Sequence, residues 1–273
     1  DSDGAIAVAL QFRRRESPVT RIIALTNQKG GVGKTTTAVN LAACLAALDR
    51  RVLLIDLDPQ GHATMGSGVD KHDLDGSVLD VLLGDKSAAE VIVDCAVAGY
   101  ALLPGNGDLT AAEVDLLDRD GRERVLTQAI DSVASDYDVV IIDCPPSLNM
   151  LTVNALTAAN GVLIPVQCEF YALEGLSALL DTVEQIQESV NPNLEIFGIV
   201  RTMFDPRNSL TRDVSKQLGQ YFGDSLLKAT IPRNVRVAEA PSHGLPVTKY
   251  ARLSRGSQAH RVLAKELIRR LAL

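Results

Sequence analysis

Apolar residues in this chain gather in short, unbroken runs, with polar or glycine-containing segments between them. Runs without polar alternation are typical of parallel strands that are covered on both faces. They predict strands at residues 22–25, 51–56, 100–104, 137–143, 161–166 and 194–200. Apolar residues at helical spacing predict helices at 34–43, 77–83, 87–93 and 172–190, and a helical stretch at 110–134 that breaks near Asp120-Gly121.

This order of elements predicts an α/β fold. We expect one domain over residues 21–273, built on a mostly parallel, twisted sheet with helices on both faces and right-handed crossovers. Residues 1–20, which include the basic cluster Arg13-Arg14-Arg15, are expected to form a mobile leader. In such a sheet ligands bind at the carboxyl ends of the strands, so the residues that follow the strands are the candidates for chemistry.

The strongest candidate is the glycine-rich segment that joins the first predicted strand to the first helix. Gly30, Gly31 and Gly33 have no Cβ, so the backbone can close around phosphate oxygens there. The helix that follows offers free N–H groups and the positive end of its dipole to an anion. Lys34 would place a charge on the outer phosphates, and the Thr35 hydroxyl is suited to bind Mg²⁺. The segment therefore predicts the P-loop of a nucleoside triphosphatase.

Carboxylates follow two further buried runs, as a P-loop site requires. Asp56 and Asp58 end the second predicted strand and precede Pro59-Gln60-Gly61. Asp143 ends the run Val139–Ile142, a Walker B pattern that places a carboxylate beside the phosphates, where it acts on Mg²⁺ through water. We expect these side chains to lie at one edge of the sheet.

Composition narrows the class of protein. The 273 residues are 46% hydrophobic and contain no run near the roughly 20 residues that a membrane span needs. The four cysteines form no C-x-x-C pair, which favours a reduced, cytoplasmic protein. The net charge of −7 alone argues against a nucleic-acid partner, but residues 201–273 hold 14 Lys and Arg against 5 Asp and Glu. This local excess of +9 predicts a basic face on an acidic body.

One departure from the common P-loop pattern is informative. Position 28 is Gln rather than Gly, and a second lysine, Lys29, stands at the entrance of the loop. The stretch from Lys29 to Thr35 resembles the deviant Walker A motif of the ParA/MinD/nitrogenase-iron-protein class of ATPases. The resemblance implies that Lys29 reaches across a nucleotide-sandwich dimer to the partner's phosphates. It also implies that Asp58 orients the attacking water and helps to hold the Mg²⁺ shell, while Asp56 supports the site.

Later segments extend the resemblance over about residues 21–270. Ile231–Arg236 and Glu239–Gly244 resemble segments typical of the chromosomal ParA/Soj proteins, and the first of them flanks the adenine in that family. The phosphate and adenine contacts then fall to Lys29, Gly30, Gly31, Val32, Gly33, Lys34, Thr35, Thr36, Pro232 and Asn234. The metal contacts fall to Thr35, Asp58 and Asp143.

A ParA/Soj-type ATPase is expected to be a slow molecular switch. The resemblance implies that ATP closes a homodimer and that the dimer binds DNA of the nucleoid without sequence preference. A ParB-like centromere-binding partner then stimulates hydrolysis and releases the DNA. The basic tail would supply the phosphate contacts, with the candidates Arg207, Arg236, Lys249, Arg252 and Arg255. The absence of Trp and the aromatic content of 4% argue against base stacking as the means of binding.

Three other classes share this P-loop. A redox iron protein needs a cysteine from each subunit at a bridging cluster, and Cys144 is the candidate, although a buried thiol is the simpler interpretation. A MinD-like membrane-cycling ATPase would use a C-terminal amphipathic helix. An apolar stripe does occur there, but at this spacing it is more often core-facing, so we do not expect membrane binding; it comprises Val262, Leu263, Leu267, Ile268 and Leu271. A ParA-like ATPase that positions another cargo would have almost the same sequence, because a surface reads the cargo adaptor.

Overall fold

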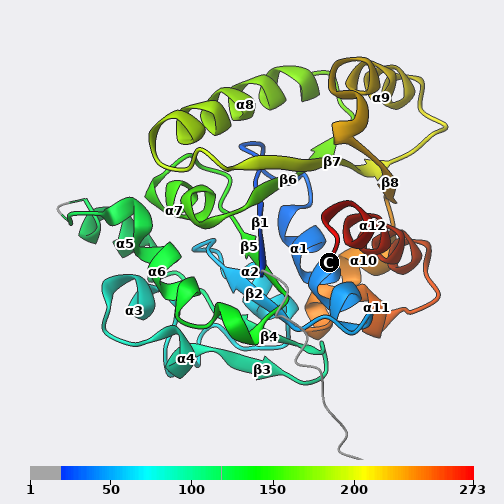
Figure 1. Ribbon diagram of the computed structural model, residues 1–273. Helices are drawn as coiled ribbons and strands as arrows, with labels where there is room; N and C mark the ends of the chain where they lie inside the picture. The colour runs from blue at the N-terminus through cyan, green and yellow to red at the C-terminus, as the bar shows by residue number, and fades with distance from the viewer. Residues whose placement is uncertain (1–19, 118) are drawn as a thin grey trace, which may run out of the picture.

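The computed structural model describes residues 20–117 and 119–273, and Figure 1 shows the course of the chain. One sheet of 8 strands runs through it in the order β3-β4-β2-β5-β1-β6-β7-β8. These strands are β1 (Arg21–Leu25), β2 (Val52–Asp56), β3 (Val93–Cys95), β4 (Tyr100–Leu103), β5 (Val139–Asp143), β6 (Gly161–Gln167), β7 (Glu195–Phe204) and β8 (Leu226–Pro232). The predicted leader, residues 1–20, falls outside the described residues except for Thr20.

The sheet is parallel except at one edge, where β3 and β4 pair antiparallel. This arrangement confirms the predicted α/β class.

Two edge strands were not predicted. The helix expected at residues 87–93 ends at Val91, and β3 begins at Val93. At the other edge, buried residues of β8 alternate with half-buried or exposed ones, so it lacks the unbroken apolar run by which the other strands were recognised.

Helices cover both faces of the sheet, as predicted (Figure 1). Side chains of each central strand alternate between two cores: Ile22 and Ala24 of β1 join one, and Ile23 and Leu25 join the other. The first core is closed by α3 (Val78–Leu83), α4 (Ala88–Val91), α5 (Leu109–Asp115), α6 (Val125–Asp131), α7 (Met150–Ala158), α8 (Ala172–Ser189) and α9 (Ser209–Phe222). The second is closed by α1 (Lys34–Ala46), α2 (His62–Gly66) and α12 (Arg255–Leu271), with α10 (Val235–Glu239) and α11 (Val247–Tyr250) packed on α12.

The last helix decides the interpretation of the C-terminal apolar stripe. Leu263 and Leu267 of α12 have no exposed surface and pack in the core beside α1 and β8, whereas Val262 is 53% exposed. The stripe therefore faces the core. Within residues 20–117 and 119–273, none of the helices combines the length and the apolar character that crossing a membrane requires.

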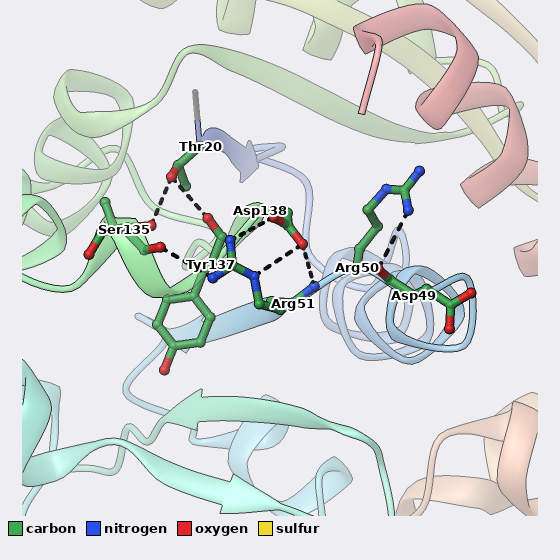
Figure 2. A network of polar contacts seen from close by, with 8 residues as sticks. Thr20, Asp49, Arg50, Arg51, Ser135, Tyr137 and Asp138 are labelled. Atoms are coloured by element: carbon green, nitrogen blue, oxygen red, sulfur yellow. Dashed lines mark hydrogen bonds and ion pairs between the residues drawn. The ribbon is translucent and has the colours of Figure 1, made fainter. Parts of the chain in front are cut away.

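Polar contacts tie together the amino ends of the central strands, far from the edge where a ligand is expected (Figure 2). Arg51 donates from its side chain to Asp138 Oδ1 at 2.8 Å and from its backbone N–H to Asp138 Oδ2 at 2.8 Å. The Thr20 hydroxyl donates to the carbonyls of Ala134 and Tyr137. The hydrogen bond from Arg51 keeps the pKa of Asp138 below its ordinary value. The starts of β1, β2 and β5 are thereby held in register.

His260 of α12 should make stability depend on pH. Its imidazole has no exposed surface, and burial lowers its pKa from 6.5 to about 4. The unfolded chain binds the proton at the higher pH, so the free energy of unfolding should fall by roughly 3 kcal/mol as the pH drops through this window. Urea unfolding of the parent and of His260→Leu from pH 8 to pH 4 measures this. We expect their stability difference to be constant above about pH 7 and to shift against the parent below it. Parallel profiles would contradict the assignment.

Candidate functional site

The P-loop joins the carboxyl end of β1 to the start of α1. Gly31 and Gly33 have φ angles of 74° and 90°, which favour glycine, and α1 begins directly at Lys34. A Cβ at Gly30 or Gly31 would meet no atom within 4 Å, so the tip of the loop faces open space. Gly33 is the N-cap residue and has no side chain to cap the helix. The loop therefore presents bare backbone at a helix N-terminus, which is the arrangement that binds phosphate.

Two side chains that we did not predict hold this loop. Asn27 Oδ1 accepts a hydrogen bond from the Lys29 N–H at 2.9 Å, and Asn27 Nδ2 donates to the Pro165 carbonyl at 2.8 Å. The Thr202 hydroxyl of β7 donates to the Val32 carbonyl at 2.7 Å. Both anchors are buried, so the loop is shaped before any ligand arrives.

Lys34 is buried among the groups that a phosphate would meet. Its Nζ donates to the Lys29 carbonyl oxygen at 3.5 Å. Burial lowers the pKa of Lys34, and the carboxylates of Asp143 and Asp58 oppose that shift. A cation held between carboxylates and an exposed loop is suited to bridge the β and γ phosphates of a nucleotide.

The three predicted carboxylates lie at the same edge of the sheet. Asp56 and Asp143 are paired in register at the ends of the neighbouring strands β2 and β5. Asp143 is also paired with Leu25, at the end of the strand that leads into the P-loop. Asp58 follows β2 and is mostly buried. The carboxyl ends of three parallel strands thus bring together residues that lie far apart in the sequence.

Asp56 and Asp143 differ in what they bind. Asp56 Oδ2 accepts hydrogen bonds from the N–H and the hydroxyl of Thr64, each at 2.7 Å. Neither buried oxygen of Asp143 accepts a hydrogen bond. Burial raises the pKa of Asp56 to about 7, and it raises the pKa of Asp143 well above its ordinary value, with the charge of Asp56 adding to the second shift. Asp56 is therefore engaged in holding the loop after β2, whereas Asp143 has oxygen atoms available for a cation.

These donors fit a magnesium ion shared with a nucleotide. The Thr35 side chain lies beside Asp143 and partly offsets the rise in its pKa, although no hydrogen bond to either oxygen is formed. Across residues 20–117 and 119–273, no group of three or more His, Cys, Asp and Glu side chains is arranged to hold a metal. Mg²⁺ held at the predicted residues Thr35, Asp58 and Asp143 would therefore complete its ligands with phosphate oxygens and water, as it commonly does at nucleotide sites.

The predicted adenine residues lie next to the predicted phosphate residues. A cavity of about 210 Å³ is lined by Gly33, Thr36 and Thr37 on one side and by Pro232, Asn234 and Val237 on the other. Asn234 Oδ1 caps α10 by accepting from the Val237 N–H at 3.3 Å, so the amide N–H₂ of Asn234 remains as its donor. The assignment of Pro232 and Asn234 to the base stays a prediction, and their placement supports it.

Lys29 makes a contact within its own chain. Its Nζ forms an ion pair with Glu169 Oε2 at 2.6 Å, and the two side chains are 42% and 46% exposed. Glu169 lies in the loop after β6 and was not predicted as a site residue. An ion pair this exposed contributes at most about 1 kcal/mol, so Lys29 can leave Glu169 for a stronger anion.

Glu169→Gln should therefore favour the predicted contact of Lys29 with a partner's phosphates. We expect the ATP-dependent dimer to form at about two- to fivefold lower protein concentration, because the competing ion pair is lost. Light scattering with ATP measures the dimer, and Glu184→Gln, at an exposed position of α8, is the matched control. Dimerisation equal to that of the control would show that Glu169 does not restrain Lys29.

The five basic residues predicted for DNA binding are not equally available. Arg207 pairs with Asp205 at 2.8 Å, and Arg236 pairs with Glu239 at 2.8 Å. The hydrogen bond from Arg207 lowers the pKa of Asp205 to about 2, with a further contribution from Arg255. By contrast, the structure shows no ion pair among its described residues for Lys249, Arg252 or Arg255. These three cations can meet a phosphate without giving up a carboxylate.

The burial of the cysteines can be compared with what a redox iron protein would require. All four are free and buried: Cys44, Cys95, Cys144 and Cys168. Cys144 has no exposed surface, and burial raises the pKa of its thiol. A cluster shared between subunits needs a thiolate at their interface. The buried-thiol interpretation of Cys144 therefore fits the structure.

Comparison with known proteins places the chain in a family. A family model described as an AAA domain matches residues 20–196. The sporulation initiation inhibitor protein Soj of Bacillus subtilis (strain 168) is 50% identical over 247 residues, which are 90% of this chain and 98% of that protein. This chain belongs to the ParA/Soj family. The chromosome partitioning protein ParA of Caulobacter vibrioides (strain NA1000 / CB15N) is 48% identical over 252 residues, which are 92% of this chain and 94% of that protein.

A solved structure extends the likeness to the three-dimensional fold of most of the chain. Cobyrinic acid a,c-diamide synthase from Mycobacterium smegmatis, with bound ADP and magnesium, has a TM-score of 0.82 at 42% identity. The match covers 93% of this chain and 96% of that one. Membership of the family confirms the resemblance that was inferred from the deviant Walker A motif and from the segment Ile231–Arg236.

Proposed function

We propose that this ParA/Soj-family chain is a slow ATPase that acts as a switch in chromosome or plasmid segregation. The arrangement at the carboxyl edge of the sheet carries the proposal. There, a bare helix N-terminus, the buried cation of Lys34 and the unpaired carboxylate of Asp143 surround one position, with Lys29 at the rim. The name of the chromosome partitioning protein ParA supports DNA segregation as the process, and the ADP and magnesium bound by the mycobacterial neighbour support ATP and Mg²⁺ as the ligands.

In this proposal the chain's own groups position the nucleotide and the water. The N–H groups of residues 30–36 and the Lys34 ammonium bind the phosphates, and the base enters the cavity beside Pro232 and Asn234. Mg²⁺, when bound at Thr35, Asp58 and Asp143, neutralises charge on the β and γ phosphates. Asp58 orients the attacking water, and Asp56 holds the Asp58 loop through Thr64.

Lys29 would convert nucleotide binding into dimerisation. It leaves Glu169, crosses to the partner's phosphates and so makes ATP part of the interface. Each chain brings one set of basic residues, and closure would place the two sets on one surface. The second DNA contact then becomes intramolecular, so affinity for DNA rises without new side chains. Hydrolysis, stimulated by a ParB-like partner, opens the dimer and releases it from the nucleoid into the cytoplasm.

Charge reversal at the available cations tests the DNA contacts. The double variant Arg252→Glu/Arg255→Glu should bind non-specific duplex DNA at least about tenfold more weakly and should lower the salt slope by about two per chain. ATP-dependent dimerisation should persist. Fluorescence anisotropy at two salt concentrations measures the affinity, and Arg269→Glu/Arg270→Glu, also exposed on α12, is the matched control. If both double variants lost affinity equally, net charge alone would explain the loss, and the assigned contacts would be wrong.

A further inference from the structure

A second cavity, of about 340 Å³, lies at the opposite end of α1 from the P-loop. It is lined by the end of α1, by α11 and by α12, which contact one another and lie together in Figure 1. The rise of 1.5 Å per helical residue places Ala43 about 14 Å along the axis from Lys34. The cavity is therefore separate from the nucleotide site.

Four cations and no carboxylate line this cavity: Lys249, Arg252, Arg261 and Lys265. In the part of the chain that the structure describes, none of the four forms an ion pair. The acidic residue of α12, Glu266, accepts hydrogen bonds from the N–H groups of Lys228 and Ala229, both at 2.8 Å. Like charges gathered around one space repel each other, and no carboxylate lines the cavity to offset that repulsion.

Arg261 is the member of this group that lies deepest in the cavity wall. It is half-buried, whereas Lys249, Arg252 and Lys265 are exposed. A half-buried guanidinium has lost part of its hydration, so an oxyanion that enters the cavity would stabilise it.

The end of α1 explains only part of this arrangement. The helix dipole places about half a negative charge there, which favours a nearby cation. Four cations exceed that charge several-fold. A bound anion would offset the remaining positive charge.

We propose that this cavity binds a small free ligand that carries phosphate groups, with the four cations around its oxyanion. The volume is within the range of small-molecule sites. Ala43, Ala47 and Leu48 form an apolar wall for the rest of the ligand. A DNA duplex could touch the exposed rim at Lys249 and Arg252. The half-buried Arg261 instead favours an occupant that enters the cavity.

A regulatory consequence rests on the proposed function. Lys249 and Arg252 line this cavity and are also among the cations available for DNA. A phosphate ligand that neutralises them would compete with DNA while leaving the P-loop free. The dimer could then hold ATP and still be off the nucleoid.

Binding of inorganic pyrophosphate tests the site directly. Titration calorimetry uses the full chain with ADP and Mg²⁺ at equal, saturating concentrations, so that the P-loop is occupied. We expect Arg261→Gln/Lys265→Gln to weaken pyrophosphate binding by about tenfold or more. Arg269→Gln/Arg270→Gln, with the same loss of charge on α12 outside the cavity, should bind as the parent does. No binding by the parent, or equal binding by both double variants, would overturn the proposal.

A DNA titration of the parent with ATP keeps the two proposals apart. A chain that binds DNA but not pyrophosphate retains the proposed function and lacks this site. A chain that binds pyrophosphate but not DNA retains the site and lacks the proposed function.

Discussion

Lys34→Ala should weaken ATP binding by at least about 100-fold, because several charge-assisted contacts to the phosphates are lost at once. The Lys34 ammonium lies near Asp143 and Asp58 and is shielded from solvent. Its removal would leave the phosphates facing these two carboxylates without that cation. Calorimetric titration with ATP and Mg²⁺ measures the affinity, and circular dichroism checks that the variant is folded.

Lys29→Ala is the matched control for this experiment. It makes the same chemical change at the loop entrance, where the side chain is half exposed and pairs with Glu169. We expect it to bind ATP with nearly the parent's affinity but to remain a monomer in light scattering. Normal ATP affinity in Lys34→Ala would contradict the P-loop assignment.

Asp58→Ala should separate binding from hydrolysis. We expect ATP to bind and the dimer to form, while the hydrolysis rate falls by about 10²- to 10⁴-fold, because the attacking water is no longer oriented. The dimer should then persist and stay bound to DNA. Phosphate release, measured with and without DNA, gives the rate.

Asp56→Asn serves as the comparison for Asp58→Ala. Asp56 is fully buried and bound to Thr64, so its substitution should reduce stability more than it changes the role of the water. If Asp58→Ala hydrolysed ATP at the parent rate and Asp56→Asn did not, the two assignments would have to be exchanged.

The pattern of apolar residues was sufficient to predict the central strands of the sheet. Strands β1, β2 and β5 are buried on both faces, so each appears as an unbroken apolar run that ends at the site. The glycines of the P-loop come shortly after the end of β1, and Asp143 is the last residue of β5. The candidate phosphate site can therefore be predicted from local sequence, because one strand and the turn after that strand supply most of its residues.

The contacts that the sequence did not reveal join distant segments. Thr202 and Val32 are 170 positions apart, and Lys29 and Glu169 are 140 positions apart. An isolated Thr or Glu has no period or motif that identifies its partner. The pairing of Arg236 with Glu239 is different, since a spacing of three on a helix is visible in the sequence.

The affinity of the full chain for a non-specific duplex, with ATP, with ADP and without nucleotide, tests most directly whether ATP creates the DNA-binding surface. We expect ATP to raise the affinity by at least about tenfold over both other states, because two sets of cations then act on one duplex. Binding with ATP should fall steeply between two salt concentrations and should not depend on the sequence of the duplex. Equal affinity in all three nucleotide states would contradict the proposed switch.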